Sequence, residues 1–384
     1  MKIGIDAHGV GGHSLGPGNE TYFQNLIGAL LDLDGSNEYH VFVNHPEAMA
    51  ETVRGHANAR LVSLWPRSQW IQRPLSLPLY ATTHGLDLVH VPFIQPMPLR
   101  ARTVLTVHDA NFELFPDDFT RLTRWRLKTF VPWSIRLADL VFTVSEFGRA
   151  NLERIYDLPP GKVVVTYNAP DHRASVDQET GRTLEGLGIR PPFVLFVGAL
   201  QPKKNLARLV RAFDAVVDRC GLPHQLVLAG KWGWGNVDLE AALAETRHRD
   251  RIRLTGYLTD EEVVRCMRAA EVFAFPSLYE CFGIPPMEAQ RLGTPCLVAN
   301  TTCFPEIYRD SALACDPHSV ESVSVALESL LLDPALRRTL TERGLRRSAD
   351  FAWARTARIA LAAYHRVCGL PEPALRGMEA SCVR

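Results

Sequence analysis

The sequence lacks the features that would mark a disulfide-bonded, membrane-spanning or nucleic-acid-binding protein. No cysteine precedes Cys220, and the eight cysteines include no Cys-x-x-Cys pair, which argues against a disulfide or zinc framework. No apolar run approaches the roughly 18 residues that a spanning helix needs. The 42 basic and 42 acidic side chains cancel, so the chain has no charge excess that would favour nucleic acid as a partner.

Signals for secretion and for metal binding are missing as well. Asp6 follows only a few apolar residues at the amino terminus, so we expect no secretory signal and a cytoplasmic protein with reduced thiols. The pair Asp32-x-Asp34 precedes Gly35-Ser36-Asn37, and we interpret it as part of a turn. We therefore expect no metal site.

What the sequence does contain is a regular alternation of two kinds of segment. Short apolar runs rich in β-branched residues alternate with amphipathic stretches, which is typical of a parallel sheet covered by helices. The alternation stops at a polar stretch that ends in Pro191-Pro192 and then starts again. The sequence thus predicts an α/β protein with two doubly wound, Rossmann-like domains that bind ligands beyond the carboxyl ends of their strands.

The domain boundaries follow from this alternation. Residues 353–367 are apolar at helical spacing and long enough to reach back across a domain boundary. We assign residues 1–170 to the first domain, 171–192 to a linker, 193–352 to the second domain, and 353–384 to a helix that returns to the first domain and a tail. The expected strands are residues 2–7, 39–43, 60–64, 87–91, 103–108, 139–145 and 162–167 in the first domain, and 193–197, 225–229, 251–257, 271–275, 296–299 and 313–315 in the second.

The segment from Phe275 to Glu288 carries the sharpest functional signal. It reads as a strand, a loop with Gly283, and a helix whose start is marked by Pro285-Pro286. Gly283 permits close backbone approach to a ligand, and a helix N-terminus favours an anion such as a diphosphate. The carboxylate of Glu288 has two oxygens that can accept hydrogen bonds from a vicinal diol such as ribose. The alternative is that Glu288 only complements the helix dipole and that Glu280, in the loop before Gly283, is a solvated loop residue.

The spacing of Glu280 and Glu288 within this segment resembles the signature of retaining glycosyltransferases of the GT-B fold, family 4. The resemblance extends over nearly the whole chain. It implies an N-terminal acceptor domain and a C-terminal nucleotide-sugar donor domain that face a central cleft. It also implies that Glu280 acts at the sugar as a catalytic residue. The expected donor-binding residues of the segment are Cys281, Phe282, Gly283, Ile284 and Glu288.

Two further stretches of the second domain resemble the same family. The strand end at Gly198 is followed by Lys203 and Lys204, where the family usually has Arg-Lys in contact with the donor phosphates. Lysine at position 203 puts a bidentate clamp there in doubt. The stretch from Arg253 to Glu262 resembles the family's nucleobase loop, in which the backbone near Leu258 contacts the base.

In the first domain, Thr106-Val107-His108-Asp109 closes a strand and resembles the family's His-Asp pair, which implies that His108 faces the donor sugar as a catalytic residue. A structural histidine is the alternative. Gly16-Pro17-Gly18 resembles the family's glycine loop beside the diphosphate, so we assign Gly18 to donor binding. The loop lacks Gly-x-Gly-x-x-Gly, which counts against a dinucleotide dehydrogenase.

A basic and aromatic helix is a candidate surface for a membrane. Arg121, Arg124 and Lys128 fall on one helical stripe of a segment that also contains Trp125 and Phe130. Such a helix can lie on anionic lipid, which would give peripheral contact at the inner membrane surface. The alternative is that its aromatic face packs on its own domain.

By resemblance, the expected activity is transfer of a hexose from a GDP-, UDP- or dTDP-linked sugar to an acceptor hydroxyl with retention of configuration. A mannosyltransferase-like role in polysaccharide, glycolipid or natural-product glycoside synthesis is expected, with a carbohydrate, lipid-linked or small-molecule acceptor. The nucleotide sugar is a co-substrate, and neither a cofactor nor a metal is expected. Two alternatives stay open: a nucleotide-sugar epimerase on the same fold, and a catalytically silent nucleotide-sugar-binding module.

Overall fold

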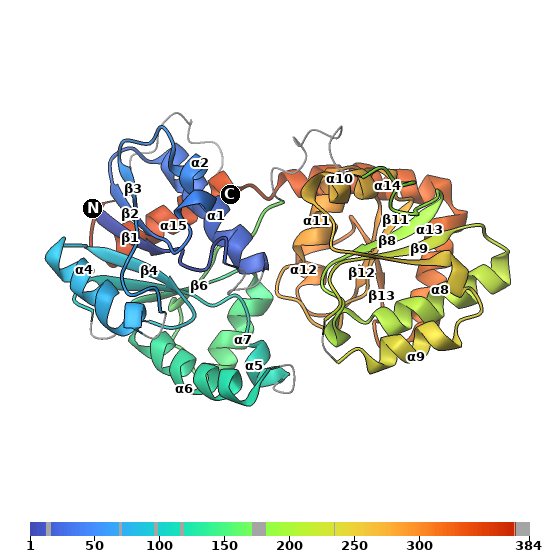
Figure 1. Ribbon diagram of the computed structural model, residues 1–384, viewed down its shortest axis with the longest axis horizontal. Coiled ribbons are helices and arrows are strands. Elements are labelled where there is room, and N and C mark those ends of the chain that lie inside the picture. The colour runs from blue at the N-terminus through green and yellow to red at the C-terminus, as the bar shows by residue number, and fades with distance from the viewer. Residues whose placement is uncertain are drawn as a thin grey trace. The chain divides into compact units, whose positions relative to one another are not determined.

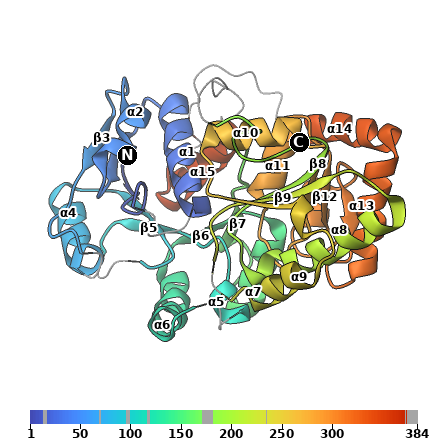
Figure 2. The same ribbon diagram turned by 45° about the vertical axis from the view of Figure 1, so that its right-hand side comes forward.

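The structure is a computed structural model that divides into two compact units. It describes residues 1–12, 17–68, 71–95, 99–115, 119–170, 182–233, 235–371 and 373. Unit 1 consists of Met1–Asn168 and Ala352–Arg384, and unit 2 of Ala169–Phe351. Each unit has one parallel sheet with helices on both faces (Figures 1 and 2).

The sheet of unit 1 has seven strands in the order β3-β2-β1-β4-β5-β6-β7. Every neighbouring pair is parallel, as the register from Lys2 opposite Glu38 to Asp6 opposite Phe42 illustrates for β1 and β2. The strands are β1 (Lys2–Asp6), β2 (Glu38–Phe42), β3 (Ala59–Val62), β4 (Leu88–Pro92), β5 (Arg102–Thr106), β6 (Leu140–Thr143) and β7 (Val163–Val165).

The sheet of unit 2 has six parallel strands in the order β10-β9-β8-β11-β12-β13. The strands are β8 (Phe193–Val197), β9 (Gln225–Ala229), β10 (Ile252–Gly256), β11 (Val272–Phe275), β12 (Cys296–Ala299) and β13 (Leu313–Cys315).

Every strand expected from the sequence forms, and the doubly wound α/β fold is confirmed. The central strands have buried residues throughout, because helices cover both faces of a parallel sheet and leave no solvated side. This burial explains why the strands read as continuous apolar runs. Many strand boundaries differ from the expected ones by one or two residues. For example, β5 ends at Thr106, and Val107 extends the ladder by a single hydrogen bond to the carbonyl oxygen of Phe142 (2.8 Å), so His108 lies beyond the strand.

Helices lie between most successive strands, as the connections of a parallel sheet require. Unit 1 contains α1 (Pro17–Leu33), α2 (Ala50–Val53), α4 (Leu77–Thr83), α5 (Asn111–Leu114), α6 (Arg121–Leu137), α7 (Glu146–Tyr156) and α15 (Trp353–Val367). Unit 2 contains α8 (Leu206–Cys220), α9 (Val237–Glu245), α10 (Asp260–Ala269), α11 (Ile284–Arg291), α12 (Phe304–Tyr308), α13 (Val320–Leu332) and α14 (Pro334–Ala349). Short turns are η1 (Pro46–Ala48), η5 (Pro202–Lys204) and η6 (Arg249–Arg251), and η2 (Gln72–Ser76) is π-helical.

Helix α15 belongs to unit 1 although it comes last in the chain; its orange-red ribbon lies beside the blue α1 in Figure 1. The hydroxyl of Tyr364 lies 2.7 Å from Nδ1 of the buried His90 on β4. The ring of Trp353 packs against Tyr22 of α1, with 5.9 Å between the ring centroids. Helix α15 is thus part of the core of this unit.

Part of the stretch assigned to the linker lies within unit 2. Residues 171–181 are outside the described residues, but residues 182–192 pack on the second sheet. The backbone N–H of Arg190 donates to Oε1 of Gln225 (2.6 Å), and Nε of Arg253 donates to the carbonyl oxygen of Leu187 (2.7 Å). Long-range hydrogen bonds therefore order this strandless segment.

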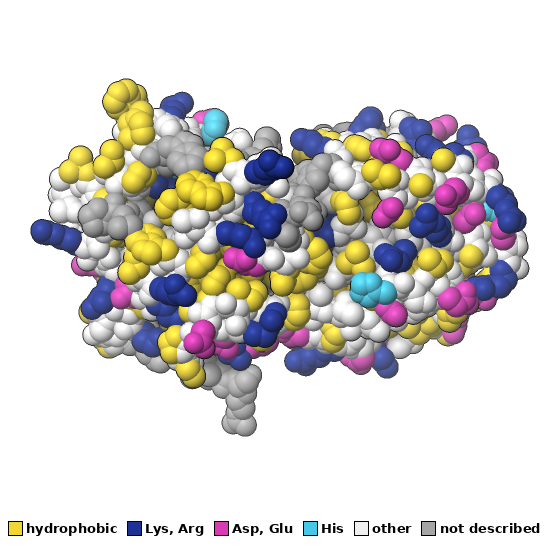
Figure 3. All heavy atoms as spheres, turned by 90° about the horizontal axis from the view of Figure 1, so that it is seen from below, with side chains coloured by type: hydrophobic (Ala, Val, Ile, Leu, Met, Phe, Trp, Pro, Cys, Tyr) yellow, Lys and Arg dark blue, Asp and Glu magenta, His cyan; other side chains and the backbone are white. Residues whose placement is uncertain are grey.

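Helix α6 does not bury its aromatic face as the alternative from the sequence would require. Its buried residues are Val131, Ser134 and Ile135, whereas Leu122 and Trp125 are 64% and 56% exposed. The space-filling view shows hydrophobic side chains on the surface of unit 1 with basic side chains among them (Figure 3). Among the described residues, no helix has the length and apolar character to cross a membrane.

Candidate functional site

The strand order of unit 2 reverses between β8 and β11. Strands β9 and β10 extend the sheet on one side of this pair, and β12 and β13 extend it on the other. At such a reversal the loops that follow the two strands lead to opposite sides, and open α/β sheets bind ligands beyond the carboxyl ends of the strands there. These loops contain most of the residues selected from the sequence.

The loop after β8 carries the two lysines in a single turn. Lys203 and Lys204 lie in the 3-10 turn η5, and Asn205 then adopts a left-handed conformation (φ 62°) before α8 begins at Leu206. The lysines thus lie in the turn that precedes α8. The carbonyl oxygen of Lys203 accepts a hydrogen bond from the N–H of Leu278 (2.8 Å), which joins this turn to the loop after β11.

Lys204 and Glu280 are in direct contact. The ammonium group donates to Oε1 of Glu280, and both side chains are 14% exposed. The same Nζ lies 4.8 Å from the centroid of the Phe275 ring at the end of β11. The structure therefore brings together the cation expected at the donor phosphates and the carboxylate expected at the sugar.

Helix α11 begins where the sequence predicts, at Ile284 after Gly283. Gly283 has φ 82°, and a Cβ there would lie 2.9 Å from Cε1 of Phe304, so both the backbone conformation and the packing require glycine. Tyr308 donates its hydroxyl proton to the carbonyl oxygen of Gly283, which fixes the turn.

The prolines at the start of α11 change what this helix end can offer an anion. Pro285 and Pro286 have no N–H, so Ile284 is the only backbone donor among the first three helical residues. The start of α11 therefore has fewer backbone N–H donors than a helix start without prolines.

The other residues selected in this segment are buried around the same turn. Cys281, Phe282 and Glu288 have exposed fractions below 9%, and Ile284 is partly buried. Burial raises the pKa of Tyr308 well above its usual range, and nearby acidic groups that include Glu280 and Glu288 raise it further. Tyr308 thus stays protonated as a donor.

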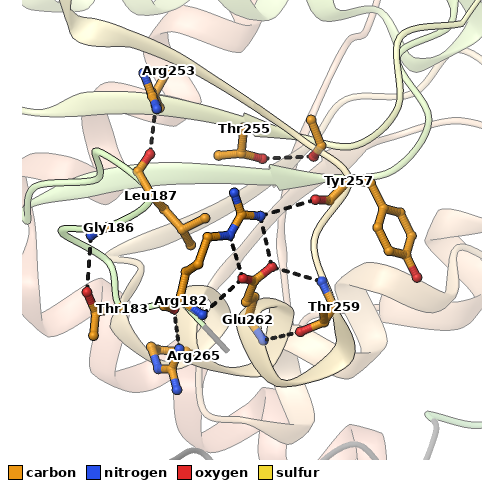
Figure 4. Close-up of polar contacts among 11 residues, drawn as sticks. Arg182, Thr183, Gly186, Leu187, Arg253, Thr255, Tyr257, Thr259, Glu262 and Arg265 are labelled. Atoms are coloured by element: carbon orange, nitrogen blue, oxygen red, sulfur yellow. Dashed lines mark hydrogen bonds and ion pairs between the residues drawn. The ribbon is translucent and has the colours of Figure 1, made fainter. Parts of the chain in front are cut away.

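The expected nucleobase loop is held by a network that the sequence did not reveal. Thr259 and Glu262 form a capping box at the start of α10, and the side chain of Leu258 is buried. Nε of Arg182 donates to Oε1 of Glu262 (2.7 Å), and Nη2 donates to Oε2 (3.2 Å) (Figure 4). Figure 4 also shows Arg182 directed at the carbonyl group of Tyr257, 3.5 Å away.

Hydrogen bonds from Arg182 lower the pKa of Glu262 to about 2, against the opposing effect of its burial. Thr259-x-x-Glu262 is a local capping signature that a sequence can reveal. Arg182 comes 80 residues earlier and gives no such signal.

His108 of unit 1 is buried beyond the end of β5. The edge of its ring packs against Tyr22, with 4.6 Å between the ring centroids. Burial lowers the pKa of His108 to about 3, so the ring is neutral near neutral pH. Among the described residues, its buried Nε2 has no hydrogen-bond partner. A neutral imidazole in this state can exchange hydrogen bonds with a hydroxyl but contributes no positive charge.

Gly18 lies in the first turn of α1, and a Cβ added there would meet no atom within 4 Å. The earlier part of the expected glycine loop, residues 13–16, is outside the described residues. Gly18 and His108 belong to unit 1, whereas the other selected residues belong to unit 2.

The interpretation of Asp34 as a turn residue is confirmed. Its Oδ2 accepts hydrogen bonds from Nδ2 of Asn37 and from the hydroxyl of Tyr39, both at 2.6 Å. Ser36 donates its backbone N–H (2.8 Å) and its hydroxyl (2.7 Å) to Oδ1. The carboxylate is fully used in closing the turn between α1 and β2.

Comparison with solved structures identifies the class of fold. Sucrose-phosphate synthase from Thermosynechococcus elongatus superposes with a TM-score of 0.72 at 19% identity, over 96% of this chain and 99% of that one. The two doubly wound units and this likeness define the GT-B fold of glycosyltransferases.

Sequence comparison identifies the family. Residues 178–347 match the model of glycosyl transferases group 1, and residues 18–173 match that of glycosyltransferase family 4. The O-antigen chain mannosyltransferase B of Escherichia coli is 30% identical over 66% of this chain and 67% of its own length. The serotype-specific mannosyltransferase WbdA of Escherichia coli is 29% identical over 60% of this chain, a match that spans only 29% of WbdA. The chain belongs to the family 4 glycosyltransferases.

Because Glu262 is paired with Arg182, we predict that the free energy of unfolding decreases in acid. Because the pKa of Glu262 in the folded state is below its ordinary value of 4.5, its contribution is complete above about pH 4.5 and is lost as the pH falls towards 2. Arg182 is half exposed, so we expect Glu262→Gln to lower the free energy of unfolding by only about 1–2 kcal/mol at pH 7. The difference from wild type should shrink in urea unfolding at pH 3. Glu240→Gln, an exposed glutamate in the first turn of α9, is the control; an equal loss there would contradict this role for the pair.

Proposed function

We propose that this chain transfers a hexose from a nucleotide-diphosphate sugar to an acceptor hydroxyl with retention of anomeric configuration. The observation that carries the proposal is the contact between Lys204 and Glu280 where the strand order of unit 2 reverses. A lysine ammonium on a flexible stem can follow a diphosphate, and an adjacent carboxylate can accept hydrogen bonds from sugar hydroxyls. Such a pair suits the junction of phosphate and sugar in the donor.

In this proposal the phosphates are bound by Lys203, Lys204 and the backbone around Gly283. The two prolines after Ile284 leave few N–H donors there, which favours charge–charge attraction over backbone donation. Binding should therefore depend strongly on the number of phosphate charges.

The nucleoside is assigned to Glu288 and to the backbone near Leu258. The side chain of Leu258 is buried, so we assign the contact with the base to the backbone of this loop. Glu288, on the second turn of α11, is the carboxylate proposed for the ribose diol.

The reaction proposed is a front-face substitution. The bond between the anomeric carbon and the departing diphosphate breaks, a bond to the acceptor oxygen forms on the same face, and the acceptor proton passes to the diphosphate. Glu280 and the neutral His108 orient the sugar through its hydroxyls, and neither forms a covalent bond to it. Lys203 and Lys204 stabilise the negative charge that develops on the leaving group.

Mannose is the proposed sugar, and a growing carbohydrate is the proposed acceptor. Both relatives cited above are described as mannosyltransferases, one of them acting on an O-antigen chain. An epimerase would turn over the donor without any acceptor, and a silent module would bind it without turnover. Product analysis with and without acceptor separates the three.

We predict that Lys204→Ala weakens binding of nucleoside diphosphate by about 1.5–3 kcal/mol, the value of a charge-assisted hydrogen bond to phosphate. Binding of the free nucleoside should hardly change. Calorimetric titration of both ligands measures the difference. Arg211→Ala, which removes a cation paired with Glu245 from the same unit, is the control. Equal losses for nucleoside and nucleoside diphosphate would exclude Lys204 from the phosphate site.

We predict that transfer proceeds without a divalent ion. The lysines supply the charge that a metal would otherwise provide, and the carboxylate of Asp34 is occupied in a turn. The reaction should continue in EDTA, and the product should keep the anomeric configuration of the donor, as read from the NMR coupling at the anomeric centre. Inactivation by EDTA with rescue by Mg²⁺ or Mn²⁺ contradicts the first part, and an inverted product contradicts the second.

We also propose peripheral contact between α6 and an anionic membrane. Arg121, Leu122 and Trp125 are exposed on one end of the helix, a combination of cation and apolar side chains that suits a lipid headgroup layer. Lys128 pairs with Glu113 at 2.9 Å, so it contributes less than the sequence suggested.

We predict that wild type co-sediments with anionic liposomes at low salt and that Arg121→Ala combined with Trp125→Ala weakens this. Each cation near such a surface contributes about 1 kcal/mol, and salt should reduce the effect. Val237→Ala with Leu332→Ala, exposed apolar residues of unit 2, should sediment like wild type. If wild type does not bind the anionic liposomes at low salt, the proposal of membrane contact is wrong.

A further inference from the structure

A buried polar cluster lies where the strand order of unit 1 reverses, between β1 and β4. Asp6 is the last residue of β1, His8 follows it, and Arg73 reaches it from the π-helical segment η2. All three residues are at most 9% exposed. The function proposed above gives these side chains no role.

Asp6 organises the cluster. Its Oδ1 lies 2.7 Å from Nδ1 of His8 and accepts the backbone N–H of His8 at 3.1 Å, and its Oδ2 accepts Nε of Arg73 at 3.2 Å. Burial alone would raise the pKa of Asp6, but the charge of Arg73 and the contacts with His8 outweigh it and lower the pKa below its usual range. Asp6 is therefore an anion that fixes both neighbours.

His8 presents a buried ring nitrogen, Nε2, that has no hydrogen-bond partner among the described residues. Because the carboxylate of Asp6 can only accept, Nδ1 of His8 carries a proton, and in the tautomer that is protonated at Nδ1 alone Nε2 is an acceptor. The ring is parallel to that of Phe42, at 13° and 6.1 Å between the centroids, which restricts its orientation. His8 is 6% exposed, and its Nε2 has no partner among the described residues. A buried acceptor without a donor is costly.

The neighbouring residue of η2 presents a second acceptor of this kind. Nε2 of Gln72 donates to Oδ1 of Asn44 (2.9 Å) and to the carbonyl oxygen of Leu64 (3.0 Å), which fixes the orientation of the amide. Gln72 is 1% exposed, and its Oε1 has no partner among the described residues. π-helical segments occur frequently at functional sites.

Arg73 adds donors to these two acceptors. Its contact with Asp6 uses Nε and leaves the outer edge of the guanidinium, with its Nη groups, for another partner. A ligand that suits the cluster must therefore both donate and accept hydrogen bonds. Phosphate and carboxylate only accept, so they would leave Oε1 of Gln72 without a donor, whereas hydroxyl groups can both donate and accept.

We propose that His8, Gln72 and Arg73, held by Asp6, form a subsite in unit 1 that binds the hydroxyl groups of an uncharged sugar or polyol. The subsite binds the acceptor of the transfer reaction, and this assignment rests on the proposed function. The binding of hydroxyl groups by the subsite does not depend on the proposed function. His8 acts as a positioning residue whose Nε2 accepts a hydrogen bond from one hydroxyl.

The test observes His8 directly in the full chain. Protein labelled with ¹⁵N-histidine is titrated with methyl α-mannoside, methyl β-galactoside and myo-inositol, and the Nε2 resonance of His8 is followed by NMR. We expect at least one of these neutral ligands to shift that resonance saturably. His8→Phe should weaken binding of that ligand about tenfold, the effect of one lost hydrogen bond, and His8→Gln should restore part of the loss.

The controls distinguish this subsite from the donor site and from a purely structural cluster. His84→Phe changes an exposed histidine whose carbonyl group contacts Lys2 at the opposite end of β1, and it should leave sugar binding unchanged. Arg73→Lys keeps a cation beside Asp6 but loses the guanidinium edge, so it should weaken sugar binding while the protein stays folded by circular dichroism. Nucleoside diphosphate is titrated into the same samples, so failure of donor binding is recorded separately.

Two results would overturn the proposal. If no neutral ligand shifts the His8 resonance up to its solubility limit, the cluster is structural. If mannose 6-phosphate shifts it and methyl α-mannoside does not, the site recognises an anion.

Discussion

The buried amide of Asn205 holds three loops of unit 2 in place. Its Nδ2 donates to the carbonyl oxygens of Pro276 (3.0 Å), after β11, and Pro317 (2.6 Å), after β13, while Asn205 itself ends the turn after β8. Asparagine tolerates the left-handed conformation that this position requires. Because Lys204 directly precedes Asn205, this neutral clamp sets where the ammonium group meets Glu280. The position of the charged Lys204–Glu280 contact thus depends on the uncharged amide of Asn205.

Features that are local in the chain could be predicted from the sequence. The strands are apolar because helices cover both faces of a parallel sheet. The apolar runs in the sequence were therefore enough to predict every strand, including β12 at residues 296–299. Gly283 and the prolines after it fixed the start of α11, and apolar spacing fixed α15 at residues 353–367. In each case the cause lies within a few residues of the element.

Features that depend on distant partners could not be predicted. Lys204 and Glu280 are 76 residues apart, Arg182 and Glu262 are 80 apart, and Asp6 and Arg73 are 67 apart. No local pattern shows that these side chains meet. The exposure of Trp125 has the same origin, since it depends on whether other elements of unit 1 cover α6.

The position of α15 in the chain bears on the order in which the protein is made. Unit 2 ends at Phe351, and α15, which completes the core of unit 1 through Trp353 and Tyr364, follows it. Domains generally fold as units during synthesis. On the ribosome, the first sheet therefore emerges with His90 and Tyr22 lacking their α15 partners, while the whole of unit 2 is synthesised. The half of the enzyme that is translated first is the half that matures last.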